Sequence, residues 1–420
     1  MNKINNIDHL YSLLPNTKTE SWKYTNIKRF LPKNLKINSN QIDVDLNSKE
    51  VLEGIISIKS PYKIWFKNGE FDKASSHVPS GMFIKKINSN SLGGHGFYAD
   101  PKGKSFCEKM EESSLFKKNE QRDNLLKINS LYDHTCFLIE FATNFSCEQH
   151  IEINNLFYNQ APGIKQHRLL CLINPGANVK IMEQTIDLSG DSNFHNTVCE
   201  IICLKKSFLE HISIQKGVQN NCSVKTSFIA QSKDSQSNFY NISLNGKMTR
   251  NNYHVNLCEE LSSTKLYGLS CVKGKDHIDN FINVMHSAAN CTSSQLFKNI
   301  YDESASGVFV GGIFVDKDSQ KTEAFQQNNN ILLSEKSQVN AVPQLEIFAD
   351  DVVCSHGCTI GQPDFDAIFY LQSRGIKKED AKALLNFAFL NDTFKNVSSK
   401  EIESIIRKLV LKQLNLKHYS

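Results

Sequence analysis

The sequence has no long apolar run and no basic leader at its start. No apolar stretch approaches the roughly 20 residues that a membrane-spanning helix needs, so we expect no membrane association. The opening MNKINNIDHLYSLLPNTK lacks the basic region followed by an apolar region that is typical of a secretory signal. These two absences predict a cytoplasmic protein.

The chain also lacks an excess of charge of either sign. Its 48 basic and 44 acidic residues give a formal net charge of +4. A nucleic-acid-binding protein usually shows a concentrated basic stripe, so this balance predicts no nucleic-acid partner. Hydrophobic residues make up 40% of the 420 residues. This composition is ordinary for a folded protein, and the length suits one large domain with appendages or two to three domains.

The 12 cysteines include no CxxC pair, although cysteine is not scarce. The missing pair argues against a zinc ribbon or a thioredoxin-like site, and a reducing cytosol disfavours structural disulfides. Most of the cysteines lie in apolar stretches such as residues 199–204. We interpret most of them as small buried side chains.

Three regions follow from the local patterns. Residues 1–60 look helical and are interrupted by Pro15 and Pro32. Residues 61–361 form a β core with a helical insertion near 105–130. Its first feature is a hairpin at Asn68-Gly69, because both residues tolerate positive φ. From about 131 to 350, short β-type runs alternate with Gly, Asn, Asp and Ser turns. No fixed repeat length emerges, so a sandwich, a barrel and a β-solenoid all remain open at this point.

Residues 362–420 return to a helical pattern. Asp364 is placed to cap the first helix, and Gly375 stands where a helix often ends in a left-handed residue. Residues 377–394 form a second amphipathic helix, and Ser398 with Glu401 has the spacing of a capping box for a third. The first two helices carry more apolar and aromatic surface than a solvent-facing helical pair needs, which predicts a protein interface.

The stretch VVCSHGCTIG (352–361) concentrates the chemistry, with Cys354, His356 and Cys358 within five positions. Residues 345–357 have the texture of one strand, in which positions two apart share a face and lie about 6.5–7 Å apart. Three ligands in a line do not surround an ion, since a closed zinc or iron–sulfur site needs about four. The row is therefore either an open metal site, a set of buried structural side chains or a Cys–His nucleophile.

Other polar residues have simpler interpretations. His211 and His286 are lone histidines in β-type runs, which is typical of core or edge positions. Asp350 and Asp351 are adjacent, so in a strand they would face opposite ways, and a solvated turn is the better interpretation.

Residues 326–376, QQNNNILLSEKSQVNAVPQLEIFADDVVCSHGCTIGQPDFDAIFYLQSRGI, resemble the SufB/SufD family of iron–sulfur cluster assembly proteins. The resemblance rests on the order of five segments, which are a QxNNxLLLS-like segment, PQLEI, CSHG, TIGQ and FYLQSRGI. Three further stretches are similar to the family: SWKYTNI (21–27), IWFKNGEF and VFVGGIFVDKDSQKTEAFQQ (308–327). CSHG is of the SufD type, whereas the SufB counterpart is of the C-E-H-E type.

The resemblance implies a right-handed parallel β-helix flanked by N-terminal and C-terminal helical parts. It implies a non-catalytic scaffold subunit that pairs with a SufB-like paralogue and docks a SufC-like ABC-type ATPase through its C-terminal helices. His356 would contribute to the cluster-forming interface, with Cys354 as a second candidate ligand. Cys358 departs from the family pattern, which has alanine there. Phe369, Tyr370, Arg374 and Gly375 are the candidate partner-binding residues.

The same resemblance implies a transient iron–sulfur cluster in the complex and no tightly bound cofactor in the chain alone. A flavin has no support in the sequence. Two alternatives stay open. One is a β-helix enzyme with Cys354 or Cys358 as nucleophile, although no G-x-S-x-G, H-E-x-x-H or phosphate-loop pattern supports it. The other is a structural adaptor without ligands.

Overall fold

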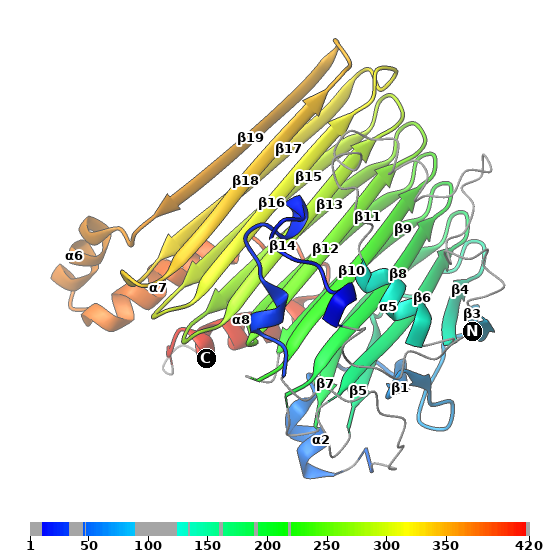
Figure 1. The fold of residues 1–420 in the computed structure, drawn as a ribbon, viewed down its shortest axis with the longest axis horizontal. Coiled ribbons are helices and arrows are strands. Elements are labelled where there is room, and N and C mark those ends of the chain that lie inside the picture. Colours follow the sequence, from blue (N-terminus) through cyan, green and yellow to red (C-terminus); the bar gives the residue numbers. More distant parts are fainter. Residues whose placement is uncertain are drawn as a thin grey trace.

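Two long sheets that share one axis make up the body of the protein. A computed structural model describes residues 11–32, 45–46, 48–88, 124–132, 135–158, 163–188, 192–216 and 220–416. Beyond the first strands, each strand pairs in parallel with the strand two positions away in the sequence, so the chain winds from one sheet to the other and back. The result is a parallel β-solenoid of about seven turns with helices at both ends (Figure 1). The expected β-helix core with helical flanks is confirmed.

The two sheets are named here by their strands. The odd sheet contains β1 (Lys63–Lys67), β2 (Glu70–Phe71), β5 (Ile151–Phe157), β7 (Asn178–Asp187), β9 (Phe208–Lys216), β11 (Gln236–Asn245), β13 (Ser263–Val272), β15 (Thr292–Tyr301), β17 (Thr322–Leu332) and β19 (Val352–Gly361). The even sheet contains β3 (Met82–Asn88), β4 (Thr135–Phe141), β6 (Ile164–Ile173), β8 (Phe194–Cys203), β10 (Cys222–Gln231), β12 (Met248–Leu257), β14 (His277–His286), β16 (Ser306–Val315) and β18 (Gln338–Ile347).

The length of one turn is not constant. Register partners on neighbouring strands of one sheet lie 26 residues apart at Cys222 and Met248, and 32 residues apart at Ser306 and Gln338. A repeat that changes by up to six residues gives no fixed period in the sequence. This explains why the sequence alone left the β architecture open.

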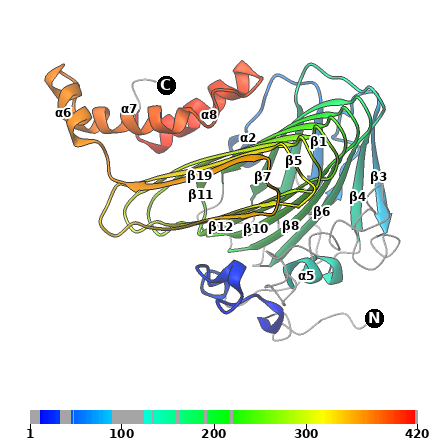
Figure 2. The ribbon, with the colours of Figure 1, turned by 90° about the horizontal axis from the view of Figure 1, so that it is seen from above.

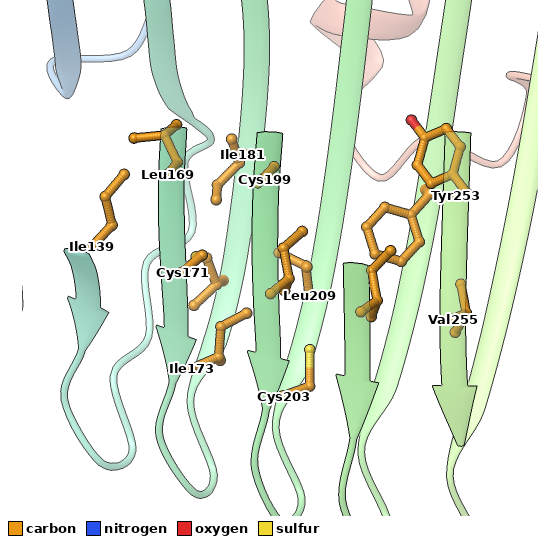
Figure 3. Close-up of a cluster of buried hydrophobic side chains, with 14 of the residues drawn as sticks. Ile139, Leu169, Cys171, Ile173, Ile181, Cys199, Cys203, Leu209, Tyr253 and Val255 are labelled. Carbon is orange, nitrogen blue, oxygen red and sulfur yellow. The ribbon is translucent and has the colours of Figure 1, made fainter. Parts of the chain in front are cut away.

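The hydrophobic core fills the space between the two sheets. Alternate residues of each strand point inward, because successive side chains of a strand face opposite ways. Cys171, Ile173 and Cys199 of the even sheet meet Ile181 and Leu209 of the odd sheet in one buried cluster (Figure 3). The interpretation of most cysteines as small core side chains holds for the seven buried ones among the eleven that the structure describes.

The N-terminal segment lies against the outer face of the even sheet. Short helical turns, η1 (Glu20–Trp22) and η2 (Ile27–Arg29), place the Trp22 ring 3.9 Å from the guanidinium carbon of Arg250. Arg250 is buried and donates hydrogen bonds to Asp279 and to the carbonyl of Ser21. The SWKYTNI stretch is thus a packing motif. The N-terminal part also contains α2 (Lys49–Gly54).

The expected hairpin is confirmed. β1 and β2 pair antiparallel around Asn68 and Gly69, which both have positive φ. Of the expected helical insertion near 105–130, the structure describes only the start of α5 (Asn124–Tyr132), and residues 105–123 lie outside the described ranges. α5 packs on the even sheet, where Asn129 donates to the carbonyl of Asn196.

Three C-terminal helices lie on the opposite side of the solenoid from α5 and the N-terminal segment (Figure 2). They are α6 (Phe365–Ser373), α7 (Lys378–Asn391) and α8 (Lys400–Gln413). Asp364 caps α6 by accepting from the amide of Ala367, and Gly375 has φ 90°, as expected. Residues of α7 and α8, including Leu390 and Ile406, share a buried cluster with the odd sheet. These two helices are therefore part of the core.

Two local expectations were wrong. Residues 345–357 are not one strand, because β18 ends at Ile347 and β19 begins at Val352, with Asp350 and Asp351 in the turn between them. Ser398 does not cap α8. Ser399 does so by accepting from the amide of Ile402, while the Ser398 hydroxyl donates to Glu210. A buried carboxylate on the sheet thus shifts the helix start by one residue.

No helix among the described residues is both long enough and apolar enough to cross a membrane.

Gly268, which faces the core, generates a testable prediction about core packing. A Cβ on Gly268 of β13 would lie 2.1 Å from the ring of Phe297 on the next turn, whereas a Cβ on Gly361 would meet no atom within 4 Å. We expect Gly268→Ala to lower the free energy of unfolding by about 1–3 kcal/mol through overpacking, and Gly361→Ala to change it by less than about 0.5 kcal/mol. Urea denaturation of both variants measures the difference, and equal midpoints would contradict this account.

Candidate functional site

The candidate site lies on β19, the last strand of the odd sheet. β19 pairs in parallel with β17 on one side, and within the described ranges no strand pairs with its other side. The same holds for β18 at the end of the even sheet. Figure 1 shows β19 at the free end of the solenoid, directly before α6. The last turn of the solenoid is therefore open.

Register places the three predicted ligands in one row. Cys354, His356 and Cys358 stand opposite Ala324, Gln326 and Asn328 of β17. In a parallel sheet such partners point to the same side, and all three residues of β17 are buried between the sheets. The expected shared face is confirmed, and it is the inward face. His356 and Cys358 are exposed nevertheless, because no further turn lies over them.

Cys354 differs from the other two residues of the row. It is half-buried and packs in a small apolar cluster with Ile313, Ala324 and Leu345. Desolvation raises the pKa of the Cys354 thiol, and it also raises the pKa of the Cys358 thiol. Neither thiol has the lowered pKa that marks an activated nucleophile.

The row does not close around an ion by itself. Within the described ranges, no group of three or more His, Cys, Asp and Glu side chains is arranged to hold a metal. Cys354, His356 and Cys358 extend along a strand, so their side chains can occupy only one side of a bound ion. A complete coordination shell there would need further ligands from outside this row.

A set of buried amides beneath the row was missed by sequence reasoning. Gln326 donates to the side-chain carbonyl of Gln295 at 2.9 Å, and Asn330 donates to that of Asn328 at 2.6 Å. We call Gln295, Gln326, Asn328 and Asn330 the amide floor. The alternation of Gln326, Asn328 and Asn330 in QQNNN is the signal that could have found it, since polar residues at every second position of a buried strand share one face.

A cleft of about 570 Å³ lies on the other face of the same strands, between the outer surface of the odd sheet and the end of α7. Asp392 stands at its helical wall and accepts from Lys298 and Lys395, each at 2.7 Å. These hydrogen bonds lower the pKa of Asp392. The lining of the cleft also includes His356, Gln326 and Gln295, so the cleft reaches the strand segments that hold the row.

The four predicted partner-binding residues lie on or just after α6. Phe369 and Tyr370 are 72% and 57% exposed, and the neighbouring Phe365 is 63% exposed. The Arg374 guanidinium lies 5.3 Å from the Tyr370 ring centre, and Gly375 ends the helix. Figure 2 shows α6 extending beyond the sheets, which agrees with the exposure of these rings.

The two lone histidines are core residues, as interpreted. His286 is fully buried beside the Ser293 hydroxyl, and burial lowers its pKa to about 3. His211 contacts Glu183, which also accepts from Lys225 at 2.6 Å. Burial alone would raise the pKa of Glu183, but its two partners hold it below the ordinary value. His211 lies on β9, five strands from β19, and His286 lies on β14, two strands from β18.

Two protein-family models match the chain. The model described as "SUF system FeS cluster assembly, SufBD core domain" matches residues 156–389, and the model described as "SufBD protein N-terminal region" matches residues 8–94. The first match covers most of the solenoid and α6, together with nearly all of α7. The row on β19 and the amide floor both fall inside it.

Individual relatives agree with these matches. The chain is 32% identical over 257 residues to an iron–sulfur cluster assembly SufBD family protein of Synechocystis sp., covering 59% of this chain and 57% of that protein. It is 31% identical over 216 residues to the iron–sulfur cluster assembly protein SufD of Escherichia coli, covering 51% of each. The chain thus spans between half and three fifths of the length of these relatives. Because the core model matches more than half of its residues, the chain belongs to the SufBD family.

Proposed function

We propose that this chain is a non-catalytic scaffold subunit for iron–sulfur cluster assembly that contributes His356 to a site shared with a SufB-like paralogue. One observation supports the proposal most. Three side chains with iron-binding chemistry lie in a row at the open end of the solenoid, and they can supply only one side of a coordination shell. Iron and sulfide are the cargo of such a site, and the second chain would complete it.

The open edge of β19 supports a strand-forming partner. This strand of ten residues contains no lysine, proline or acidic residue, which are the usual devices that keep an edge strand from pairing. Its Val353 and Ile360 are exposed. A strand of the SufB-like paralogue along this edge would satisfy the unpaired backbone groups and cover both apolar side chains.

The exposed rings of α6 support a second partner, a SufC-like ATPase. Aromatic side chains dominate the binding energy of many interfaces when they become buried there. Phe365, Phe369 and Tyr370 project from one short helix that stands clear of the solenoid. No part of the chain that the structure describes covers these three rings, so they are suited to contact with a separate subunit.

The proposal assigns no resident cofactor to the isolated chain and places its work in the cytoplasm. The cluster is transient and belongs to the assembled complex. A flavin has no binding residues that we can name in the described ranges. Catalysis by Cys354 or Cys358 is disfavoured, because desolvation raises the pKa of both thiols.

The first prediction from the proposed function concerns His356. We expect His356→Ala to leave folding and partner assembly unchanged, because the side chain is exposed, and to lower cluster loading on the complex by about tenfold or more, because an iron ligand is lost. Cys354→Ala should have a smaller effect and Cys358→Ala little effect. Iron and acid-labile sulfide are measured after anaerobic reconstitution of the complex with the SufB-like paralogue. Normal loading of the His356 variant would remove the proposed role.

The second prediction concerns α6. We expect the double substitution Phe369→Asp and Tyr370→Asp to weaken ATPase binding by about 30-fold or more, since buried aromatic anchors are each worth about 2 kcal/mol. Leu52→Asp on α2 is the matched control, because Leu52 is also an exposed apolar residue on a short helix. Binding of the SufC-like ATPase is measured by titration. Point variants are preferable to removal of residues 363–420, since that deletion would also uncover the core beneath α7 and α8.

The third prediction concerns the thiols. Because desolvation raises their pKa, we expect alkylation of Cys354 and Cys358 by iodoacetamide to keep accelerating as the pH rises towards about 9, with no plateau near neutrality. Peptide mass spectrometry follows each site, with glutathione as the reference thiol. A rate plateau below pH 7 at either cysteine would indicate a stable thiolate and favour the nucleophilic alternative.

A further inference from the structure

The amide floor is one of several sets of buried amides in the solenoid, and it is the set that pairs in register with β19. Gln326 and Asn328 are 1% and 0% exposed, yet the Gln326 Oε1 and Asn328 Nδ2 atoms have no hydrogen-bond partner among the described residues. A buried amide group without a partner costs about 1–3 kcal/mol. Both residues lie on the turn directly beneath β19, where Gln326 pairs in register with His356 and Asn328 with Cys358. The unpaired atoms therefore lie next to the proposed site.

Space for Gln326 is provided from the opposite sheet. Gly311 of β16 lies across the core from it, and a Cβ on Gly311 would come within 2.4 Å of the Gln326 Nε2 atom. A larger residue at position 311 would push the amide aside. The core is thus shaped to hold a glutamine side chain at this position.

The neighbours of the two amides leave one specific atom of each unused. Gln326 uses its Nε2 to donate to Gln295, so its Oε1 remains as an acceptor. Asn328 uses its Oδ1 to accept from Asn330 and from the Cys358 thiol, so its Nδ2 remains as a donor. Gln326 Oε1 lies on the turn below His356, and Asn328 Nδ2 lies on the turn below Cys358.

We propose that Gln326 is a positioning residue for His356 and that Asn328 stabilises anionic sulfur at the same site. Gln326 Oε1 accepts the N–H of one imidazole nitrogen of His356, which leaves the lone pair of the other nitrogen for iron. Metal-binding histidines usually donate their second ring N–H to such an oxygen. Asn328 Nδ2 donates to a sulfide or thiolate held beside Cys358. This inference rests on the function proposed above.

The test compares neighbouring residues of one strand that face opposite ways. Gln326→Leu removes the acceptor, and Gln327→Leu makes the same change on the outer face. Gln326→Glu keeps an acceptor oxygen, and the unpartnered Gln295 Nε2 can then donate to the new carboxylate. Asn328→Asp removes the donor and adds a carboxylate charge, and Asn329→Asp is its outer-face control because it adds the same charge. Each variant is assembled with the SufB-like paralogue and the ATPase and loaded anaerobically with ferrous iron and sulfide.

We expect Gln326→Leu and Asn328→Asp to lower cluster loading by about tenfold, as loss of a ligand-orienting group does at other metal sites. Gln326→Glu should retain most of the loading, and both outer-face controls should match the wild type. The double variant His356→Ala with Gln326→Leu should load no worse than His356→Ala alone, because the two residues act through the same bond. A merely structural glutamine would not show this rescue and non-additivity.

Two outcomes separate this inference from the proposed function. Normal loading of Gln326→Leu and Asn328→Asp, with loading lost in His356→Ala, overturns the role of the floor and leaves the scaffold function intact. Normal loading of His356→Ala overturns the scaffold site itself. Thermal unfolding of each isolated variant shows whether it folds. If the leucine lowers the midpoint, Gln326→Met replaces it, because methionine matches the length of glutamine without its acceptor.

Discussion

Parallel pairing between successive turns is the constraint on which the rest of the structure depends. Each strand must find its partner one full turn later, so every inward side chain stands directly above another from the previous turn. This stacking forms the columns of the core, and it also means that the last turn has an unpaired edge. The position of the candidate site on β19 is a consequence of the same constraint. A solenoid without a cap over its last turn presents one row of inward residues to its surroundings.

The parts of the fold that depend on neighbouring residues could be predicted from the sequence. Asn68-Gly69 forms its hairpin and Asp364 caps its helix, because in both cases the decisive contacts lie within a few residues. The shared face of Cys354, His356 and Cys358 follows from strand alternation alone. The expectation that a metal site formed by these residues would be open came from their number and spacing, since three residues in a line cannot enclose an ion.

The remaining features depend on residues that are distant in the sequence. The turns contain left-handed residues such as Lys206, Leu261 and Lys321, which are not turn-forming types and are held there by the stacked strands. The start of α8 depends on Glu210, which binds Ser398 from the sheet and leaves the cap to Ser399. The amide floor required register, because only the pairing of β17 with β19 reveals which polar residues lie beneath His356. Local patterns contain none of this information.

The core beneath the open edge of the solenoid contains buried polar side chains. Buried amides occur along the solenoid, and some of them, such as Asn155 and Asn241, also keep an unpaired side-chain oxygen. Beneath the open edge, Gln326 and Asn328 each keep an unused hydrogen-bonding atom. Apolar residues of similar size would stabilise the isolated chain more, since burying an unsatisfied polar group is unfavourable. Because unpaired amides occur elsewhere in the solenoid too, the feature that links Gln326 and Asn328 to the proposed site is their register beneath His356 and Cys358.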